Sequence, residues 1–173
     1  MIILETERLL LRHFEAGDLD ALFALYRDQE VRRYFHEGTL TLEETRGELD
    51  WYRNGHPKHP ELGLWATTLK VSGQFIGRCG LLPWTIDGQD EIEIAYLLDK
   101  TFWGQGLGTE AARGIRDFAI EKLGLTRLIC LIDAHNRASI RVAEKTGMSF
   151  EKEGRDELGP FLLYSIERPG RTI

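Results

Sequence analysis

Three glycines alternate along one short segment of the chain, at Gly104, Gly106 and Gly108 in WGQGLGTEA. They lie between a strand-like run and a helix-like run. Glycine lets the backbone approach a ligand closely, and the first turn of a helix carries amide N–H groups without partners inside the helix. The backbone from Gly104 to Thr109 therefore predicts an anion site, for which a pyrophosphate is the expected ligand. A glycine-rich turn that binds nothing is the alternative.

The same segment also matches a dinucleotide-binding pattern. Residues 106–111 fit G-x-G-x-x-A, and Asp133 ends the next predicted strand, where a ribose-binding acid would lie. A Rossmann domain needs further strand-helix-strand units, whereas only about 40 residues follow Asp133. No Gly-Lys-Ser/Thr follows the glycines, so a Walker A loop is absent. A dinucleotide site stays as the weaker alternative.

Two carboxylates, Glu91 and Glu93, lie on the predicted strand before the glycine turn and share one of its faces. A carboxylate inside an apolar strand costs several kcal/mol unless a cleft solvates it. The pair therefore indicates a cleft beside the turn, where a carboxylate is a candidate for proton transfer. A surface-facing position on the strand is the alternative.

Composition limits the class of protein. The chain has 173 residues, 42% of them hydrophobic, which predicts a single globular domain over residues 1–173. The 22 basic against 28 acidic residues give a net charge of −6, which argues against nucleic-acid binding and favours a cationic substrate. The opening MIILETERLLLRHFE is too charged for a secretory signal, and no run of roughly 20 apolar residues predicts a membrane span. A cytoplasmic protein is expected.

The cysteines and histidines do not predict a metal site. Cys79 and Cys130 lie inside apolar runs, which indicates buried free thiols. His56 and His59 are the closest histidine pair, but the prolines between and after them make a solvated loop more plausible than a tetrahedral ligand set.

Periodicity predicts the elements that must position the glycines and the carboxylates. Apolar alternation indicates a strand over 8–14, Asp18 is a plausible N-cap of a helix, and Thr41 and Glu44 have the spacing of a capping box. Short strands with tight turns then predict an antiparallel meander. The predicted elements of this half are the strand 8–14, a helix after Asp18, a helix over 41–54, and strands over 64–71, 74–82 and 91–98.

After residue 98 the period changes to about 3.6. The predicted elements are a helix through 111–122 ended by Gly124, a strand over 127–133, a helix over 136–146, and strands near 148–153 and 161–166. The order gives an α/β (α+β) fold with a mixed, mostly antiparallel central sheet of about seven strands and helices on both faces.

Two motifs in this order resemble a known family. WGQGLGTEA after EIAYLLD, followed one strand later by NRASIRVAEKTGM, is similar to the GNAT superfamily of N-acetyltransferases. TERLLLR near the start resembles its RimJ/RimL branch, which acetylates ribosomal-protein N-termini. The resemblance covers nearly the whole chain. Trp103 departs from the superfamily pattern Q/R-x-x-G-x-G/A at its first position, so no polar side-chain contact is expected there.

The resemblance implies acetyl-CoA as co-substrate and no metal. It implies that the backbone of Tyr96, Leu97 and Leu98 pairs with the pantetheine arm as an added strand, and that Asn136 contacts the same arm. The residues implied to hold the pyrophosphate are Gly104, Gln105, Gly106, Leu107, Gly108 and Thr109.

The resemblance also implies roles in proton transfer. An acceptor amine is mostly protonated at pH 7, so a base must remove a proton before the amine attacks. Glu93 matches the position where this superfamily often carries its base, and Ser139 matches a thiol-contacting residue that can donate a proton. Tyr164, on the last predicted strand, is the alternative donor.

The sequence indicates less about the acceptor substrate than about the cofactor. Acids and aromatics in the first half of the chain would suit a cationic amine, although an exposed helix face explains most of the acids. A protein N-terminus or a small-molecule amine would qualify, and the enzyme would act as a monomer or homodimer. A non-catalytic acyl-CoA-binding or sensor domain is the alternative function. The side chains in question are Tyr34, Phe35, Glu43, Glu44, Glu48, Asp50, Trp51 and Tyr52.

Overall fold

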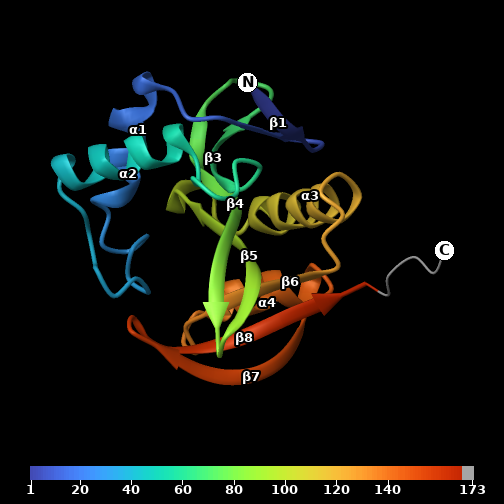
Figure 1. The fold of residues 1–173 in the computed structure, drawn as a ribbon. Helices are drawn as coiled ribbons and strands as arrows, with labels where there is room; N and C mark the ends of the chain where they lie inside the picture. The colour runs from blue at the N-terminus through green and yellow to red at the C-terminus, as the bar shows by residue number, and fades with distance from the viewer. Residues whose placement is uncertain (169–173) are drawn as a thin grey trace.

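The computed structural model describes residues 1–168. One eight-stranded sheet, in the order β1-β2-β3-β4-β5-β6-β8-β7, runs through the molecule (Figure 1). Its strands are β1 (Ile2–Glu5), β2 (Leu9–Arg12), β3 (Gly63–Leu69), β4 (Phe75–Ile86), β5 (Gln89–Leu98), β6 (Arg127–Ile132), β7 (Ser149–Asp156) and β8 (Gly159–Glu167). The α-helices of the described residues are α1 (Leu19–Tyr26), α2 (Leu42–Asn54), α3 (Leu107–Glu121) and α4 (Arg137–Lys145).

The sheet is antiparallel except between β5 and β6, which confirms the prediction of a mixed, mostly antiparallel sheet. These two strands run parallel and are paired at Glu93 and Ile129. Over residues 1–168 the ladder between them extends no further than this pair. The later parts of β5 and β6 therefore diverge and leave an opening in the sheet.

Helices cover both faces of the sheet, which confirms the sequence prediction (Figure 1). On one face, Leu22 of α1 and Leu49 of α2 pack with Leu64 of β3. On the other face, Ile115 of α3 and Ile140 of α4 belong to the larger core. The opening between β5 and β6 thus lies between two helical layers.

Local sequence explains where the helices begin. Thr41 and Glu44 form the predicted capping box at the start of α2. Asp18 precedes α1, but its carboxylate binds Arg12 and the Glu15 amide and does not cap the helix. The prediction of Asp18 as an N-cap was therefore right about the boundary and wrong about the contact.

The sheet has one strand more than the sequence predicted. β1 forms an edge strand on β2, and the Thr6 amide donates to the Leu9 carbonyl in the turn between them. The strand has four residues and charged neighbours follow it, so its alternation is too short to recognise. Cys79 and Cys130 are both buried and free, as predicted. Across residues 1–168, none of the helices has the length and apolarity needed to cross a membrane.

Candidate active site

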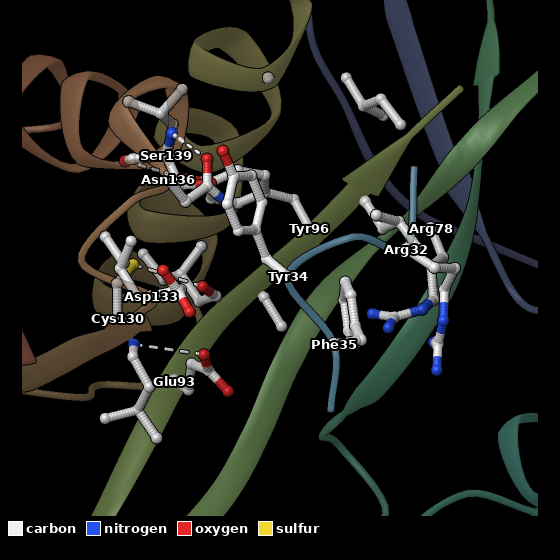
Figure 2. A pocket seen from close by; sticks show the side chains of 18 of the residues that line it. Arg32, Tyr34, Phe35, Arg78, Glu93, Tyr96, Cys130, Asp133, Asn136 and Ser139 are labelled. Atoms are coloured by element: carbon white, nitrogen blue, oxygen red, sulfur yellow. Dashed lines mark hydrogen bonds between the residues drawn. The ribbon is translucent and has the colours of Figure 1, made fainter. Parts of the chain in front are cut away.

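A cavity of about 970 Å³ lies where β5 and β6 diverge. Its wall includes β4, β5, the glycine turn before α3, the start of α4 and the segment between α1 and α2. Figure 2 shows side chains from both halves of the chain pointing into this space. The cavity collects most of the residues that the sequence assigned to catalysis and to the cofactor.

Glu93 lies on β5 and lines the cavity. Trp84 Nε1 on β4 donates to one carboxyl oxygen at 2.7 Å, and the Leu131 amide on β6 donates to the other at 3.3 Å. Burial raises the pKa of Glu93 to about 7, against the opposing effect of these two donors and of the positive charge of Arg78. A carboxyl group with this pKa can accept and release a proton at neutral pH.

Glu91 has a different environment although it shares a strand face with Glu93. It is buried and forms an ion pair of 2.9 Å with Arg127 at the start of β6. Arg127 also binds Glu151 on β7 and Glu167 on β8. The carboxylate is thus a partner in an ion cluster between strands and does not line the cavity.

Asn136, Ser139 and Tyr96 meet at the start of α4 (Figure 2). The Asn136 side-chain oxygen accepts a hydrogen bond from the Ser139 amide at 3.1 Å and so caps the helix. The Tyr96 hydroxyl donates to the Ser139 carbonyl at 3.2 Å. All three line the cavity, whereas Tyr164 is buried in the core against Phe150 and does not.

The glycine turn has the backbone that an anion site requires. Gly104 and Gly106 adopt positive φ angles of 74° and 78°, and Gly106 precedes the first residue of α3. A Cβ atom on Gly108 would lie 3.8 Å from both Leu98 and Val142, so this glycine brings the helix close to β5 and α4. The free amides of the first turn and the adjoining cavity together fit a pyrophosphate and an extended arm.

Most of the predicted cofactor residues line the cavity, and Gln105 does not. The residues on the wall are Tyr96, Leu97, Leu98, Gly104, Gly106, Leu107, Gly108, Thr109 and Asn136. The Gln105 side chain donates instead to the Thr101 carbonyl at 3.2 Å. Trp103 donates to the Leu98 carbonyl at 2.9 Å, which fixes the turn against the end of β5.

The N-terminal segment holds the turn from outside the cavity. Arg8 forms an ion pair of 2.6 Å with Glu110 of α3, and it donates to the Gln105 carbonyl at 3.0 Å. The Thr6 hydroxyl donates to the same Glu110 carboxylate. The TERLLLR segment therefore positions the glycine turn.

Comparison with known proteins agrees with this arrangement. A family profile described as "Acetyltransferase (GNAT) domain" matches residues 8–149. The chain belongs to the GNAT acetyltransferase family. It is similar to the uncharacterized protein YkkB of Bacillus subtilis, with 36% identity over 162 residues, or 93% of each chain.

Solved GNAT structures have the same fold. The acetyltransferase (GNAT family) from Bacillus anthracis superposes with a TM-score of 0.81 at 25% identity, over 96% of this chain and 98% of that one. The ribosomal L7/L12 α-N-protein acetyltransferase RimL, solved in complex with coenzyme A, gives 0.78 at 17% identity, over 96% and 98%. This acetyltransferase fold contradicts the Rossmann alternative, because β5 and β6 form the only parallel pair within residues 1–168.

Two arginines of this GNAT cavity were missed by the sequence analysis. Arg32 and Arg78 line the side that faces α1 and α2, although both are buried. Arg78 stands alone as a charge in the apolar run QFIGRCGLL, which is the same signal that drew attention to Glu93. Of the four acids expected near the acceptor, Glu48 alone is on the wall among the described residues, and Glu44 caps α2.

Proposed function

We propose that residues 1–173 form a single cytoplasmic N-acetyltransferase domain that transfers an acetyl group from acetyl-CoA to a primary amine. The acceptor is a protein N-terminus or a small-molecule amine. The observation that carries the proposal is the position of Glu93, a carboxyl group with a pKa of about 7, in the wall of the cavity where β5 and β6 diverge.

In this proposal the co-substrate binds along the opening in the sheet. The amides from Gly104 to Thr109 hold the pyrophosphate, and the backbone of Tyr96 to Leu98 pairs with the pantetheine arm. The Asn136 side-chain oxygen already caps α4, so its amide group is the part left to contact the arm. These contacts place the thioester between Ser139 and Glu93.

The proposed chemistry needs two proton transfers. Acetyl-CoA supplies a thioester whose carbonyl carbon bonds to the amine nitrogen while the carbon–sulfur bond breaks. Glu93 accepts the proton that the ammonium group loses, directly or through a water molecule, before the amine attacks. The Ser139 hydroxyl donates a proton to the departing sulfur and takes a replacement from the nitrogen, which carries one proton too many after its attack, so the products are an amide and a thiol.

The RimJ/RimL branch is the part of the family that we propose for this chain. The contacts of Thr6 and Arg8 with Glu110 give the N-terminal TERLLLR motif a physical role beside the cofactor turn. The RimL structure named above shares the fold and was solved with coenzyme A. We propose a monomer or homodimer as the acting species. A non-catalytic acyl-CoA-binding domain is disfavoured by a cavity that contains a carboxyl group poised near pH 7.

A thiol-release assay with acetyl-CoA and a panel of amines tests the proposal. Positioned bases contribute about 10² to 10⁴ in rate, so Glu93→Gln should lower kcat at least tenfold at pH 7. Acetyl-CoA affinity, measured by calorimetry, should stay nearly unchanged. Glu43→Gln, an exposed change on α2, is the control. Full kcat in Glu93→Gln would remove the catalytic role of this residue.

A further inference from the structure

The acceptor side of the cavity contains two buried guanidinium groups. Arg78 on β4 and Arg32, between α1 and α2, are only 7% and 5% exposed. Figure 2 shows their side chains next to each other beside Phe35. The Phe35 ring centroid lies 4.3 Å from the Arg32 guanidinium carbon and 5.7 Å from that of Arg78.

Within residues 1–168 neither guanidinium donates a hydrogen bond to a carboxylate, although Glu37 lies near Arg32 and Glu48 is linked to Arg78 through the hydroxyls of Tyr52 and Tyr26. Arg78 donates through Nε to the Tyr26 hydroxyl, and no Asp or Glu in residues 1–168 lies within 4.0 Å of it. Arg32 donates through Nε to the Gly38 carbonyl, and Glu37, half exposed, is 3.7 Å from one terminal nitrogen. Over the same residues no fully enclosed side-chain nitrogen lacks a partner, so the terminal nitrogens of Arg78 face the open cavity.

This arrangement favours an anion in the cavity. Burying two cations side by side is costly, and for Arg78 the Tyr26 hydroxyl and the charge of Glu48 oppose that cost and raise its pKa. Burial, together with the charge of Arg78, lowers the pKa of Arg32. An oxyanion between the two guanidinium groups would accept hydrogen bonds from both and remove their repulsion.

The geometry relates this anion subsite to Glu93. In the β4–β5 ladder Arg78 is opposite Leu97, and Glu93 is opposite Leu82. Four residues along a strand is about 13 Å, and both side chains lie on the face that α1 and α2 cover. The glycine turn begins α3, which packs on the other face, so Arg32 and Arg78 are not placed to serve the pyrophosphate.

We propose that Arg32 and Arg78 bind an oxyanion of the acceptor, so that the substrate class is an amine with a carboxylate or phosphate on the same molecule. The inference rests on the proposed N-acetyltransferase function. It also refines the expectation from the net charge of −6, because two guanidinium groups line the acceptor side of the cavity. The shared requirement is a planar or tetrahedral oxyanion that can accept paired hydrogen bonds from guanidinium groups.

Matched acceptors test the proposal. We would compare 4-aminobutyrate with butylamine, and 2-aminoethyl phosphate with ethanolamine, in the thiol-release assay. The charged member of at least one pair should have a kcat/KM at least tenfold higher, and the pair that shows it identifies carboxylate or phosphate. Arg78→Met and Arg32→Met should raise KM for that acceptor at least tenfold and leave KM for acetyl-CoA unchanged. Arg78→Lys should restore part of the loss, and Arg46→Met, exposed on α2, should change nothing.

A binding measurement separates this inference from the proposed function. Calorimetry with 4-aminobutyrate and with 2-aminoethyl phosphate, on protein saturated with CoA, should show binding of one probe that Arg32→Lys and Arg78→Lys weaken. Such binding without turnover of any amine would support the anion subsite and contradict the acetyl-transfer proposal. Equal or better use of the uncharged amines would overturn the subsite and leave acetyl transfer intact. A rise in KM for acetyl-CoA in the arginine variants would also overturn it.

Discussion

The Glu93 carboxyl takes its properties from residues on two neighbouring strands. The sequence shows that this carboxylate lies inside an apolar strand, and that position predicts a cleft beside it. The donors Trp84 and Leu131 were not, because they come from β4 and β6 and face Glu93 only after the sheet has formed. The same holds for Arg32 and Arg78, which are 46 residues apart in the chain and meet in one cavity.

At this scale we predict a pH profile controlled by Glu93. Its pKa of about 7 means that the carboxylate, the form that accepts a proton, increases as the pH rises through 7. We expect kcat/KM for the acceptor, which reports the pKa of the free enzyme, to be about one tenth of its plateau at pH 6, and Glu93→Gln to lose this limb. Trp84→Phe removes a donor that lowers the pKa, so the limb should move to higher pH.

The folding stability of the protein should also depend on pH through the Glu93 carboxyl group. It should fall as the pH rises, whereas the activity rises. The folded-state pKa of Glu93 lies above the ordinary value of 4.5, so the folded protein holds a proton that the unfolded chain releases between pH 4.5 and 7. Its contribution to stability is therefore lost as the pH rises through this window. The melting temperature of Glu93→Gln minus that of the wild type should increase from pH 4.5 to pH 7.5, and a constant difference would contradict the raised pKa.

Among the elements, local signals predicted most helices and strands, and tertiary pairing decided the rest. The capping box of Thr41 and Glu44 and the 3.6-residue period of α3 are encoded within a few residues. β1 was missed because an edge strand of four residues depends on β2 for its hydrogen bonds. No local signal predicts the divergence of β5 and β6 after Glu93, since it depends on a parallel pairing between distant segments, and it was expected only through the family resemblance, which implied an added strand along residues 96–98.

At the glycine turn, an effect on acetyl-CoA binding can be measured separately from the effect of a strained backbone on stability. Gly106→Val places a side chain at a φ of 78° beside the expected pyrophosphate and should weaken acetyl-CoA binding at least tenfold, about 1.4 kcal/mol. Gly124 has a φ of 70° in the turn after α3, with open space around it. Gly124→Val should therefore cost similar stability and leave acetyl-CoA affinity unchanged. Equal affinity in both variants, measured by calorimetry, would make the turn purely structural.

At the scale of the whole molecule, Arg127 connects β5, on one side of the opening in the sheet, with β7 and β8 on the other side. It lies at the start of β6 and binds carboxylates of β5, β7 and β8 through Glu91, Glu151 and Glu167. The Glu91 side chain is 9% exposed, whereas that of Glu167 is 67% exposed. Loss of Arg127 would leave Glu91 buried without a partner, which costs far more than loss of an exposed ion pair.

We therefore predict unequal effects from two changes to this ion cluster. Arg127→Met should lower the free energy of unfolding by about 3 kcal/mol, which for a chain of this length is a fall of about 6–12 °C in Tm. Glu167→Gln should change the free energy by less than about 0.5 kcal/mol. Adding Glu91→Leu to Arg127→Met should recover part of the loss, because the uncompensated carboxylate is then removed. Thermal unfolding of the three variants measures these differences. A fall in Tm for Arg127→Met no larger than that for Glu167→Gln would mean that the buried pair does not stabilise the fold.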